Sequence, residues 1–268
     1  MSGYHYGRPE MANSYSNVLS ILSAHDSLHS VRTSSLPLTQ FWGPTGLAAR
    51  LAKIPFLKSA GVKDAEMFFE FPTSVQKGKG KASMTDLMII TSSHRIAVEA
   101  KYTEYQNGEY EKISMWNKGN EKNKWDVVDG WLKYMGLNRV YVPEIGRVPY
   151  QLLHRIASAY ADRGDLKPAV VYQLFYDEET EKRLDKFVGM LKDGLAFLSP
   201  KGLHFLVIKT YVERVPVELG KEDGDYYLRM CEGKANREVY GSLEKSEVLF
   251  EVNPTFHVRT RFQLSPKE

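Results

Sequence analysis

The sequence predicts an α/β fold in which a mixed β-sheet is flanked by helices. Two observations favour it: apolar runs of strand length alternate along the chain with longer segments whose apolar residues recur at helical spacing. The 268 residues, of which 43% are hydrophobic, are enough to bury a sizeable core. No internal repeat or long linker divides the chain, so we expect one domain over residues 15–268 after a poorly ordered segment over 1–14.

Helices are expected first in the chain. One is predicted around residues 15–30 and another over 46–57, where Gly43-Pro44-Thr45 opens the helix. Pro55 should end or bend this second helix, because proline lacks the amide hydrogen that the helix interior requires. Together these helices precede the strands of the predicted sheet.

The segment 65–74 reads as the first strand of the predicted sheet, and Pro72 closes it. Side chains alternate between the two faces of a strand, so Glu66, Phe68 and Glu70 are expected on one face. Glu66 and Glu70 are therefore the acids that this strand could present next to the strand expected over 83–91.

Two adjacent apolar strands, over residues 83–91 and 95–103, carry charged side chains. Asp86 lies on the first, and Glu99 and Lys101 lie on the second. Glu99 and Lys101 must point the same way, because they are two residues apart on a strand. Burying such charges is costly unless they are paired or bind a metal, so their position favours a function.

The register of this hairpin decides whether Asp86 joins the other two charges. A two-residue loop at Ser92-Ser93 puts Asp86 opposite Glu99, and a loop at Ser93-His94 puts it opposite Lys101. Either register places all three on one face. A three-residue loop would instead send Asp86 to the other face.

Two carboxylates and a lysine suit one chemistry, since carboxylates hold a divalent cation and an ammonium positions water or a phosphate. The acidic-x-Lys pattern alone is weak, because it also occurs at Asp165-Leu-Lys167 and Glu232-Gly-Lys234. Only Glu99-Ala-Lys101 interrupts a strand that otherwise reads as core. The alternative is a surface pair between Glu99 and Lys101 on an exposed strand face.

The pattern Asp-x12-Glu-Ala-Lys on a hairpin resembles the PD-(D/E)xK nuclease superfamily, which has the restriction-endonuclease-like fold. A closer similarity to single-domain bacterial proteins of this type is carried by four segments: FEFP (69–72), TDLMII (85–90), VEAKYTE (98–104) and YQLLHRIASAYA (150–161). The resemblance implies an αβββαβ core over about residues 40–215 and hydrolysis of phosphodiester bonds with Mg²⁺ or Mn²⁺. It leaves a C-terminal strand extension over 216–268. The sequence departs at Thr85, where the superfamily has a proline that shapes the backbone.

The resemblance also implies a metal site. Asp86 and Glu99 would hold the cation, and the backbone carbonyl of Ala100 is a further candidate ligand. Glu70 is the candidate for an additional acid on the neighbouring strand, and Glu66 is the alternative to it. Either glutamate would equally suit a solvent-exposed strand.

Two further residues receive roles from this resemblance. Lys101 would stabilise the nucleophile or the charge that develops on the phosphate. Gln151, at the start of a later helix, would orient water, a phosphate oxygen or Lys101 through hydrogen bonds, unless it only lies on a polar helix surface. His154 and Arg155 on the same helix are weaker candidates.

Lysines and glycines alternate in the segment 76–81, which joins the first two strands of the predicted sheet. Lys77, Lys79 and Lys81 are therefore candidates for contacts with nucleic-acid phosphates. A solvated, flexible hairpin loop explains the same composition. The net charge of +3 does not by itself indicate a nucleic-acid-binding protein.

A polar region over residues 102–126 follows Lys101 and contains Trp116 and Trp125. These rings either stack on bases beside neighbouring lysines or anchor a long loop to the core, and the second reading is favoured. Glu104 either binds a second metal or faces solvent. The remaining elements are expected as helices over 126–136, 150–164 and 180–198 and strands over 168–177, 203–212, 225–230 and 247–252.

Other protein classes are disfavoured by composition. The single cysteine, Cys231, excludes an intramolecular disulfide and fits a cytoplasmic location. No apolar stretch is long enough to span a membrane, and the N-terminus lacks the apolar core of a signal peptide. No zinc-binding histidine spacing and no nucleophile elbow occurs.

The charged residues predict a metal-dependent phosphodiesterase, and the resemblance implies an endodeoxyribonuclease that acts on DNA, with RNA as an alternative substrate and with restriction or defence as its setting. The alternative is a non-catalytic nucleic-acid-binding or assembly module that keeps the nuclease fold. A homodimer would suit paired cuts across a duplex. A further partner in defence would fit the same setting.

Overall fold

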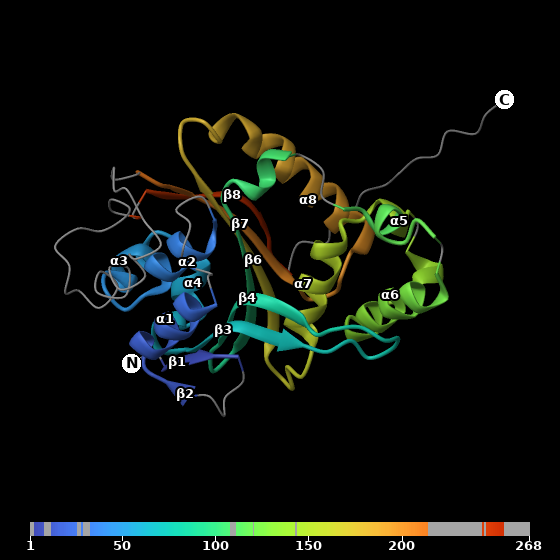
Figure 1. Ribbon diagram of the computed structural model, residues 1–268, viewed down its shortest axis with the longest axis horizontal. Coiled ribbons are helices and arrows are strands. Elements are labelled where there is room, and N and C mark those ends of the chain that lie inside the picture. Colours follow the sequence, from blue (N-terminus) through green and yellow to red (C-terminus); the bar gives the residue numbers. More distant parts are fainter. Residues whose placement is uncertain are drawn as a thin grey trace.

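The computed structural model describes residues 3–7, 12–25, 28, 33–107, 111–119, 121–142, 144–213, 243 and 245–254. Its centre is one mixed sheet with the strand order β2-β1-β3-β4-β5-β6-β7-β8. Figure 1 shows this sheet between two groups of helices, α1 to α4 on one side and α5 to α8 on the other. The prediction of an α/β fold with a mixed, helix-flanked sheet is confirmed.

The N-terminal part of the chain contributes two short strands and four helices. The strands are β1 (Gly3–Tyr6) and β2 (Ala12–Asn13), and β1 pairs in parallel with β3. The helices are α1 (Tyr15–Ala24), α2 (Ser35–Trp42), α3 (Leu47–Ala52) and α4 (Pro55–Ser59). The segment 1–14, which the sequence predicts to be poorly ordered, lies partly outside the described residues, and its described part contains β1 and β2.

Two of the predicted helices differ from the structure. The helix expected around 15–30 ends at Ala24. The helix expected over 46–57 is divided into α3 and α4, and Pro55 is the first residue of α4, as proline at that position loses no intrahelical hydrogen bond. The sequence pattern missed α2 altogether, although its apolar residues are buried.

Three antiparallel strands form the part of the sheet that carries the predicted site. They are β3 (Glu66–Thr73), β4 (Ser83–Ile90) and β5 (His94–Lys101), and the 3₁₀ helix η2 (Val62–Asp64) precedes them. Thr91 donates its backbone amide to the carbonyl of His94 at 2.9 Å, and Ile90 pairs with Arg95. The hairpin loop is therefore Ser92-Ser93, the first of the two registers considered.

Helices and strands alternate in the second half of the described chain. The region after β5 forms η3 (Glu104–Asn107), α5 (Ile113–Trp116), α6 (Lys122–Tyr134), η4 (Arg139–Tyr141) and η5 (Ile145–Arg147). Then follow α7 (Tyr150–Tyr160), β6 (Lys167–Tyr176), η6 (Glu181–Arg183), α8 (Leu184–Leu198), β7 (His204–Tyr211) and β8 (Ser246–Val252). β5, β6 and β7 are parallel, and β8 is antiparallel to β7.

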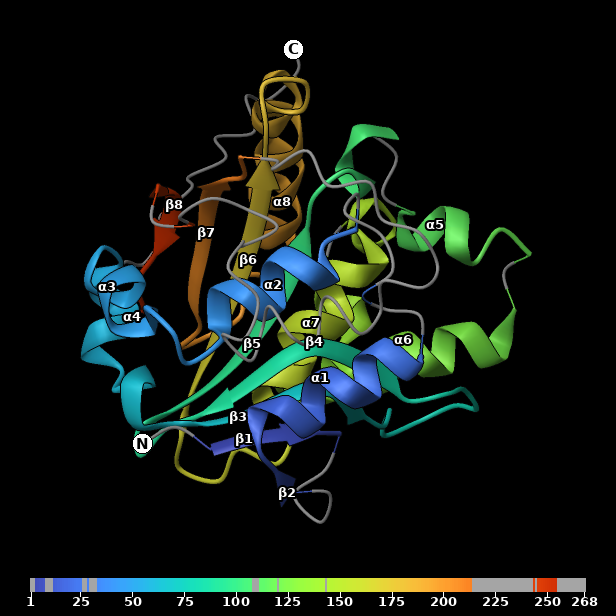
Figure 2. The same cartoon turned by 60° about the vertical axis from the view of Figure 1, so that its left-hand side comes forward.

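The sheet separates two hydrophobic cores. One includes Leu19 of α1, Phe41 of α2 and Val98 of β5, and the other includes Trp131 of α6, Ile156 of α7 and Tyr172 of β6. Figure 2 shows α1 and α2 in front of the sheet and α7 behind it. Within the described parts of the chain, no helix combines the length and apolar character needed to cross a membrane.

Some predictions lie outside the described residues. The strand expected over 225–230 and Cys231 belong to this group, as does most of the C-terminal extension over 216–268. Within that extension, the expected strand over 247–252 corresponds to β8, which adds an antiparallel strand to the edge of the sheet.

Candidate functional site

The strands β4 and β5 separate where the charged residues begin. Their antiparallel pairing runs from Ile90 and Arg95 to Leu87 and Val98, and ends there. The next position in this register sets Asp86 against Glu99. Instead of another ladder bond, the Ala100 amide donates to Oδ2 of Asp86 at 2.8 Å. We call this opening between the two strands the fork.

Beyond the fork, β5 stays in the sheet by pairing with β6. Glu99, Ala100 and Lys101 lie in register with Tyr172, Gln173 and Leu174 of that parallel strand. The charged end of β5 is therefore held rigidly on one side, while β4 diverges on the other. An acid on β4 and two charges on β5 meet at a fixed position without a loop between them.

Glu99 lies at the bottom of the fork with a side chain that is 2% exposed. Its Oε1 atom is 2.6 Å from Nζ of Lys101, and its Oε2 atom forms an ion pair with Nη2 of Arg155. Burial disfavours its charged form, but Arg155 and Lys101 outweigh that effect and lower the pKa of Glu99 to about 2. The carboxylate is therefore ionised and bound by two cations.

Arg155 reaches the fork from α7, on the other side of Glu99. Its side chain is 2% exposed, and Nη2 donates to the carbonyl of Met84 at 2.9 Å and lies 4.0 Å from Oδ1 of Asp86. The nearby carboxylates of Glu99 and Asp86 raise the pKa of Arg155, although burial opposes this. The helix thus supplies a second buried cation to the hairpin.

Glu70 is the third carboxylate near the fork, and its backbone is unusual. Its φ of 51° lies in the left-handed region, which residues with a side chain adopt only at a cost. The β3–β4 pairing runs through Phe69 with Leu87 and Phe71 with Thr85, so Glu70 stands at the register position of Asp86. The kink also places Phe68 and Phe71 against the same core, which breaks the predicted alternation.

The carboxylates of Glu70 and Asp86 repel each other. Burial and then the charge of Asp86 raise the pKa of Glu70 to about 7. Burial and then the charge of Glu99 raise the pKa of Asp86 to about 6. Both groups are thus poised to lose a proton near neutral pH, and a bound cation would favour that loss.

A small open pocket ends at these residues. Glu70, Asp86 and Lys101 line it from the strands, and Leu22, Ser34 and Leu38 are among the residues that line it from the helical side. Burial works against the charged form of Lys101, but the carboxylates of Glu99 and Asp86 prevail and raise its pKa, so the side chain stays an ammonium ion at neutral pH. Glu99 and Arg155 do not line the pocket.

The fork offers two carboxylates, those of Glu70 and Asp86, as ligands for a divalent cation. Among the described residues, no group of three or more His, Cys, Asp or Glu side chains is arranged to hold a metal ion. Glu70 and Asp86 are nevertheless two carboxylates whose repulsion a cation would relieve, and Mg²⁺ commonly uses one or two carboxylates with water and phosphate oxygens. Both oxygens of Glu99 are occupied by cationic partners.

The other candidates on α7 have different surroundings. Gln151 is partly buried, and its Oε1 atom is buried without a hydrogen-bond partner among the described residues. The Nδ1 atom of His154 lies 2.8 Å from Oγ of Ser83, and burial lowers the pKa of His154 to about 3. His154 is thus a neutral residue that joins α7 to β4.

The two alternative acids are engaged elsewhere. Glu66 forms an ion pair with His5 at the far end of β3. Oε1 of Glu104 accepts hydrogen bonds from the amide and hydroxyl of Ser34, and Oε2 accepts one from the Tyr102 amide at 2.6 Å. Glu104 therefore joins the end of β5 to the start of α2. Of the two candidate acids on β3, Glu70 lies beside the fork and Glu66 does not.

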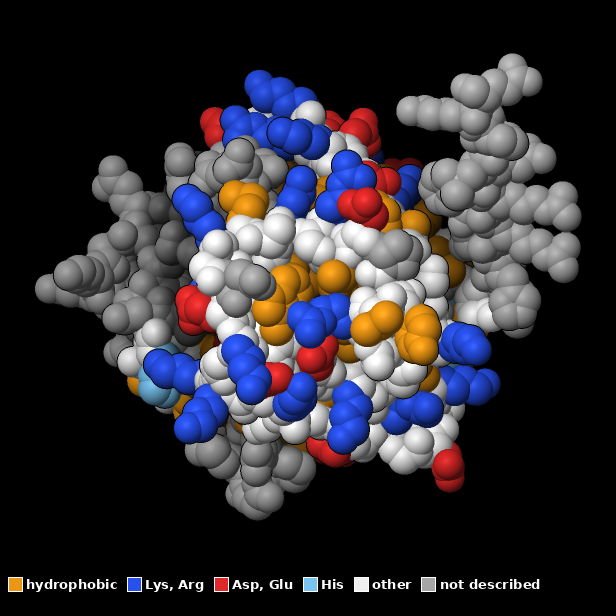
Figure 3. Space-filling view, turned by 90° about the vertical axis from the view of Figure 1, so that its right-hand side faces the viewer, with side chains coloured by type: hydrophobic (Ala, Val, Ile, Leu, Met, Phe, Trp, Pro, Cys, Tyr) orange, Lys and Arg blue, Asp and Glu red, His pale blue; other side chains and the backbone are white. Residues whose placement is uncertain are grey.

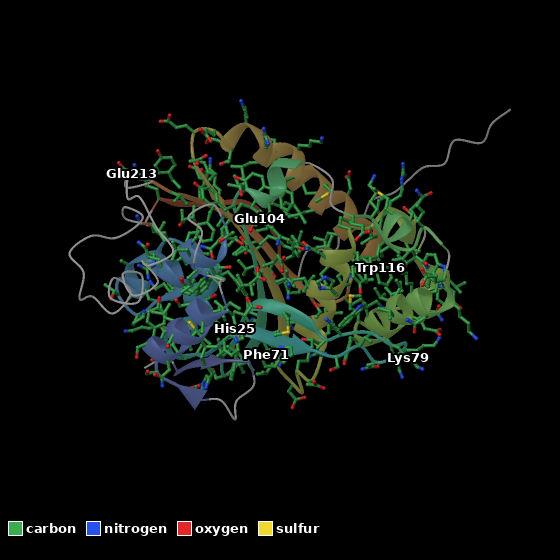
Figure 4. All side chains as sticks on the ribbon, in the orientation of Figure 1. His25, Phe71, Lys79, Glu104, Trp116 and Glu213 are labelled. Atoms are coloured by element: carbon green, nitrogen blue, oxygen red, sulfur yellow. The ribbon has the colours of Figure 1, made fainter. Side chains whose placement is uncertain are left out.

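The basic loop between β3 and β4 packs against α6. Lys77 lies 2.7 Å from Asp126 and 3.5 Å from Asp129, and Asn123 exchanges two hydrogen bonds with the backbone of Lys79. Gly78, with a φ of 87°, has no room for a Cβ, which would lie 2.7 Å from a Val127 methyl. The loop is therefore attached to α6, in contrast to the alternative of a solvated, flexible hairpin loop. Figure 4 shows Lys79 in this loop and Phe71 on β3, near the end from which the loop begins.

Trp116 and Trp125 belong to the same region. Trp116 stacks on Tyr150 with ring centroids 4.1 Å apart, and Trp125 lies under the Arg139 guanidinium at 4.5 Å. Both rings pack against the α6–α7 core. This agrees with the favoured reading, in which the tryptophans anchor the region.

Arg155 is only a weaker candidate by sequence, and the structure places it in contact with Glu99 at the fork. The signal was present, because Arg155 lies four residues after Gln151 and so on the same side of the helix. Its long side chain sits in a segment whose other residues are mostly apolar. A buried arginine on such a helix indicates a buried carboxylate partner.

The chain was also compared with known proteins. The family model described as "Domain of unknown function (DUF6946)" matches residues 12–224, which include the fork, α7 and the basic loop. Comparison with curated proteins and with solved structures gives no match. Because the model covers most of its length, the chain belongs to the DUF6946 domain family.

Proposed function

We propose that the protein is a metal-dependent nuclease that hydrolyses phosphodiester bonds in DNA, with the fork as its active site. The observation that carries the proposal is the convergence of Asp86, Glu99 and Lys101 at the point where β4 leaves β5. Glu70 adds a third carboxylate from β3. Removing several charges from water costs folding stability, and charges gathered in this way beside a pocket are typical of functional sites.

The element order supports a restriction-endonuclease-like core. Helices precede an antiparallel β3-β4-β5 meander, and α7 then crosses over to β6, which is parallel to β5. This is the αβββαβ order expected from the PD-(D/E)xK resemblance. Membership of that superfamily remains part of the proposal.

In the proposed reaction, Glu70 and Asp86 would hold a Mg²⁺ or Mn²⁺ ion through their carboxylates. The ion would supply Lewis-acid stabilisation of the phosphate and a more acidic bound water. Glu99 and the Ala100 carbonyl remain candidate ligands on β5. For Glu99 this requires that one of its cationic partners withdraws.

Lys101 is proposed to act as an electrostatic group. Its raised pKa keeps the amine protonated at neutral pH, so it cannot accept the proton of an attacking water. The ammonium lines the pocket and can stabilise negative charge on the phosphate as water attacks phosphorus and the P–O bond breaks. Gln151 remains a proposed orienting residue, because its buried Oε1 atom has no hydrogen-bond partner among the described residues and is free to accept one.

Contacts with the DNA backbone are assigned to one surface. We call it the basic arm, and it consists of the loop 76–81 and the helical region 111–147. These segments contain ten Lys and Arg residues and five Asp and Glu residues. Their net charge of +5 is larger than the +3 of the whole chain. Figure 3 shows Lys and Arg side chains spread over this face. Lys79 and Lys81 are exposed there, whereas Lys77 is paired with Asp126.

A second function has one observation in its favour. Both oxygens of Glu99 are bound by cations, which is also what a non-catalytic nucleic-acid-binding or assembly module with a remnant site would contain. Such a module would still use the basic arm. It would bind DNA without requiring a divalent cation.

The test is a cleavage panel at low salt. Supercoiled plasmid, linear duplex, single-stranded DNA and RNA are incubated with protein and Mg²⁺, Mn²⁺ or EDTA. The nuclease proposal predicts cutting of a DNA substrate that EDTA abolishes and that Asp86→Asn loses. DNA binding that is indifferent to EDTA, with no cutting of any substrate by folded protein, would favour the binding module.

A further inference from the structure

The guanidinium of Arg155 has an uneven set of partners. Nη2 contacts Glu99, the Met84 carbonyl and, at 4.0 Å, Asp86. Nε and Nη1 are equally buried, and neither has a hydrogen-bond partner among the described residues. Three contacts thus fall on one nitrogen, while two donor nitrogens have none.

Gln151, one helical turn away on α7, has a buried acceptor that lacks a donor within the described part of the chain. Gln151 precedes Arg155 by four residues on α7, the spacing at which side chains meet on a helix. Its buried Oε1 atom has no donor among the described residues. Arginine side chains on helices lean toward the N-terminus, which is the direction of Gln151. Buried donors and acceptors normally find partners, so this pair offers a second position for the guanidinium.

The charges at the fork explain why two positions would be useful. With Arg155 and Lys101 on Glu99, the site is neutralised from inside the protein. A divalent cation at Asp86 would lie close to the Arg155 guanidinium, which is 4.0 Å from Asp86 Oδ1, and like charges at that distance repel. A cation and Arg155 in its present position therefore compete for the same carboxylates.

We propose that Arg155 is a positioning residue that holds the carboxylates of the fork in the absence of metal and moves from Glu99 toward Gln151 when a divalent cation binds. This inference rests on the proposed function, because it assumes that the fork takes a cation. In it, Gln151 acts by accepting Arg155, and Glu99 becomes a ligand only after Arg155 leaves. Arg155 itself does not touch substrate.

The experiment is calorimetric titration of Mn²⁺ into the full chain without DNA. Arg155→Met removes the positive charge that competes with the metal ion near Asp86, so Mn²⁺ binding should tighten about tenfold or more. A tenfold change in affinity corresponds to about 1.4 kcal/mol. Gln151→Leu removes the second position and should weaken binding severalfold. Asp86→Asn should abolish binding.

Arg95→Met is the matched control. Arg95 is also a buried arginine that contacts α7, donating to the Ser158 carbonyl at 3.1 Å, and it stacks over Phe71 instead of contacting a carboxylate of the fork. Its loss should lower the melting temperature and leave Mn²⁺ affinity unchanged. A purely structural role of Arg155 would make Arg155→Met behave like this control.

Unchanged or weaker Mn²⁺ binding by Arg155→Met, with wild type binding Mn²⁺ through Asp86, would overturn the inference and leave the proposed function standing. Absence of binding by wild type and by every variant would contradict the proposed function itself. Should Arg155→Met fail to fold, Gln151→Leu decides, because unchanged Mn²⁺ affinity in that variant contradicts the second position.

Discussion

Charged side chains meet in two regions, at the fork between β4 and β5 and on the basic arm. At the fork, Glu99 and Arg155 are each 2% exposed, and Glu99 contacts both Lys101 of its own strand and Arg155 of α7. On the arm, Lys77 is 54% exposed and pairs with aspartates that are 26% exposed. The same residue types therefore have different consequences, because solvent screens the ion pairs of the arm far more than it screens the buried pair of Glu99 and Arg155.

The shifts in pKa are larger and more varied at the fork than on the arm. The pKa of Glu70 and the pKa of Asp86 are raised and the pKa of Glu99 is lowered within one small region. Divergent pKa values in neighbouring acids are typical of sites that bind cations or transfer protons. On the arm, the Asp126 pKa is lowered first by its hydrogen bond with Lys77, which an ordinary surface ion pair also does.

The largest expected effect is on stability at the fork. Glu99→Gln leaves Arg155 and Lys101 buried without their carboxylate, and removal of one partner from a buried pair typically costs about 3–5 kcal/mol in unfolding free energy. Asp126→Asn on the arm removes the partner of an exposed lysine and should change stability little. Urea denaturation of both variants measures the difference. Equal losses in the two would erase the distinction drawn between the regions.

Activity should respond nearly as strongly. Asp86→Asn removes the carboxylate that lies between Glu70 and Glu99, and a single group of this kind commonly contributes about 10²–10³-fold to a rate. The variant should be folded, since Asn can still accept the Ala100 amide. Single-turnover cleavage measures the loss. A rate within threefold of wild type would remove Asp86 from the proposed mechanism.

Much of the fork could be predicted from the sequence, because it depends on local rules. The two-residue loop sets the register, and strand periodicity then puts Glu99 and Lys101 on one face with Asp86 opposite Glu99. The separation of the strands at this position has no local signal. The partner that holds β5 in the sheet beyond this position is β6, which is more than sixty residues further along the chain.

The contributions of Glu70 and Arg155 could not be predicted in the same way. The left-handed backbone at Glu70 contradicts ordinary residue preferences and is imposed by its neighbours in the sheet. The contact of Arg155 depends on which face of α7 turns toward the sheet, and several faces of that helix are buried. The basic loop was identified from its composition, but its attachment to α6 depends on Gly78 and on Asn123.

The dependence of stability on pH should show the opposed shifts. Glu70 and Asp86 have raised pKa values, so their contribution is present at low pH and is lost as pH rises through about 6 to 7. Glu99 has a lowered pKa, so its contribution is present above the ordinary glutamate range and is lost as pH falls toward about 2. Without divalent cation, stability should therefore decline by about 1–3 kcal/mol between pH 5 and 8.

Melting temperatures across this pH range measure that decline. Glu70→Gln should flatten it, because the variant no longer carries the proton that Glu70 loses. Addition of Mn²⁺ should stabilise wild type more at pH 8 than at pH 5. A decline that Glu70→Gln leaves intact would show that the coupling is not at the fork.

The smallest expected effect belongs to the arm. Replacing Lys79, Lys81 and Lys122 by Gln should weaken duplex binding about tenfold at low salt and reduce the dependence of log affinity on log salt by about 2–3. Fold stability should not change measurably. Replacing Lys53, Lys58 and Lys63, which are exposed around α3 and α4, makes the same charge change elsewhere. Equal losses in both triple variants would mean that the arm has no special role.

The most direct test of the central claim compares one lysine from each region. Plasmid cleavage in Mn²⁺ is measured for wild type, Lys101→Met and Lys77→Met, with EDTA as the blank. If Lys101 acts at the active site, metal-dependent cleavage should fall about 10²-fold or more in Lys101→Met and stay within a few-fold of wild type in Lys77→Met. Cleavage by wild type that Lys101→Met retains would contradict the assignment of catalysis to the fork.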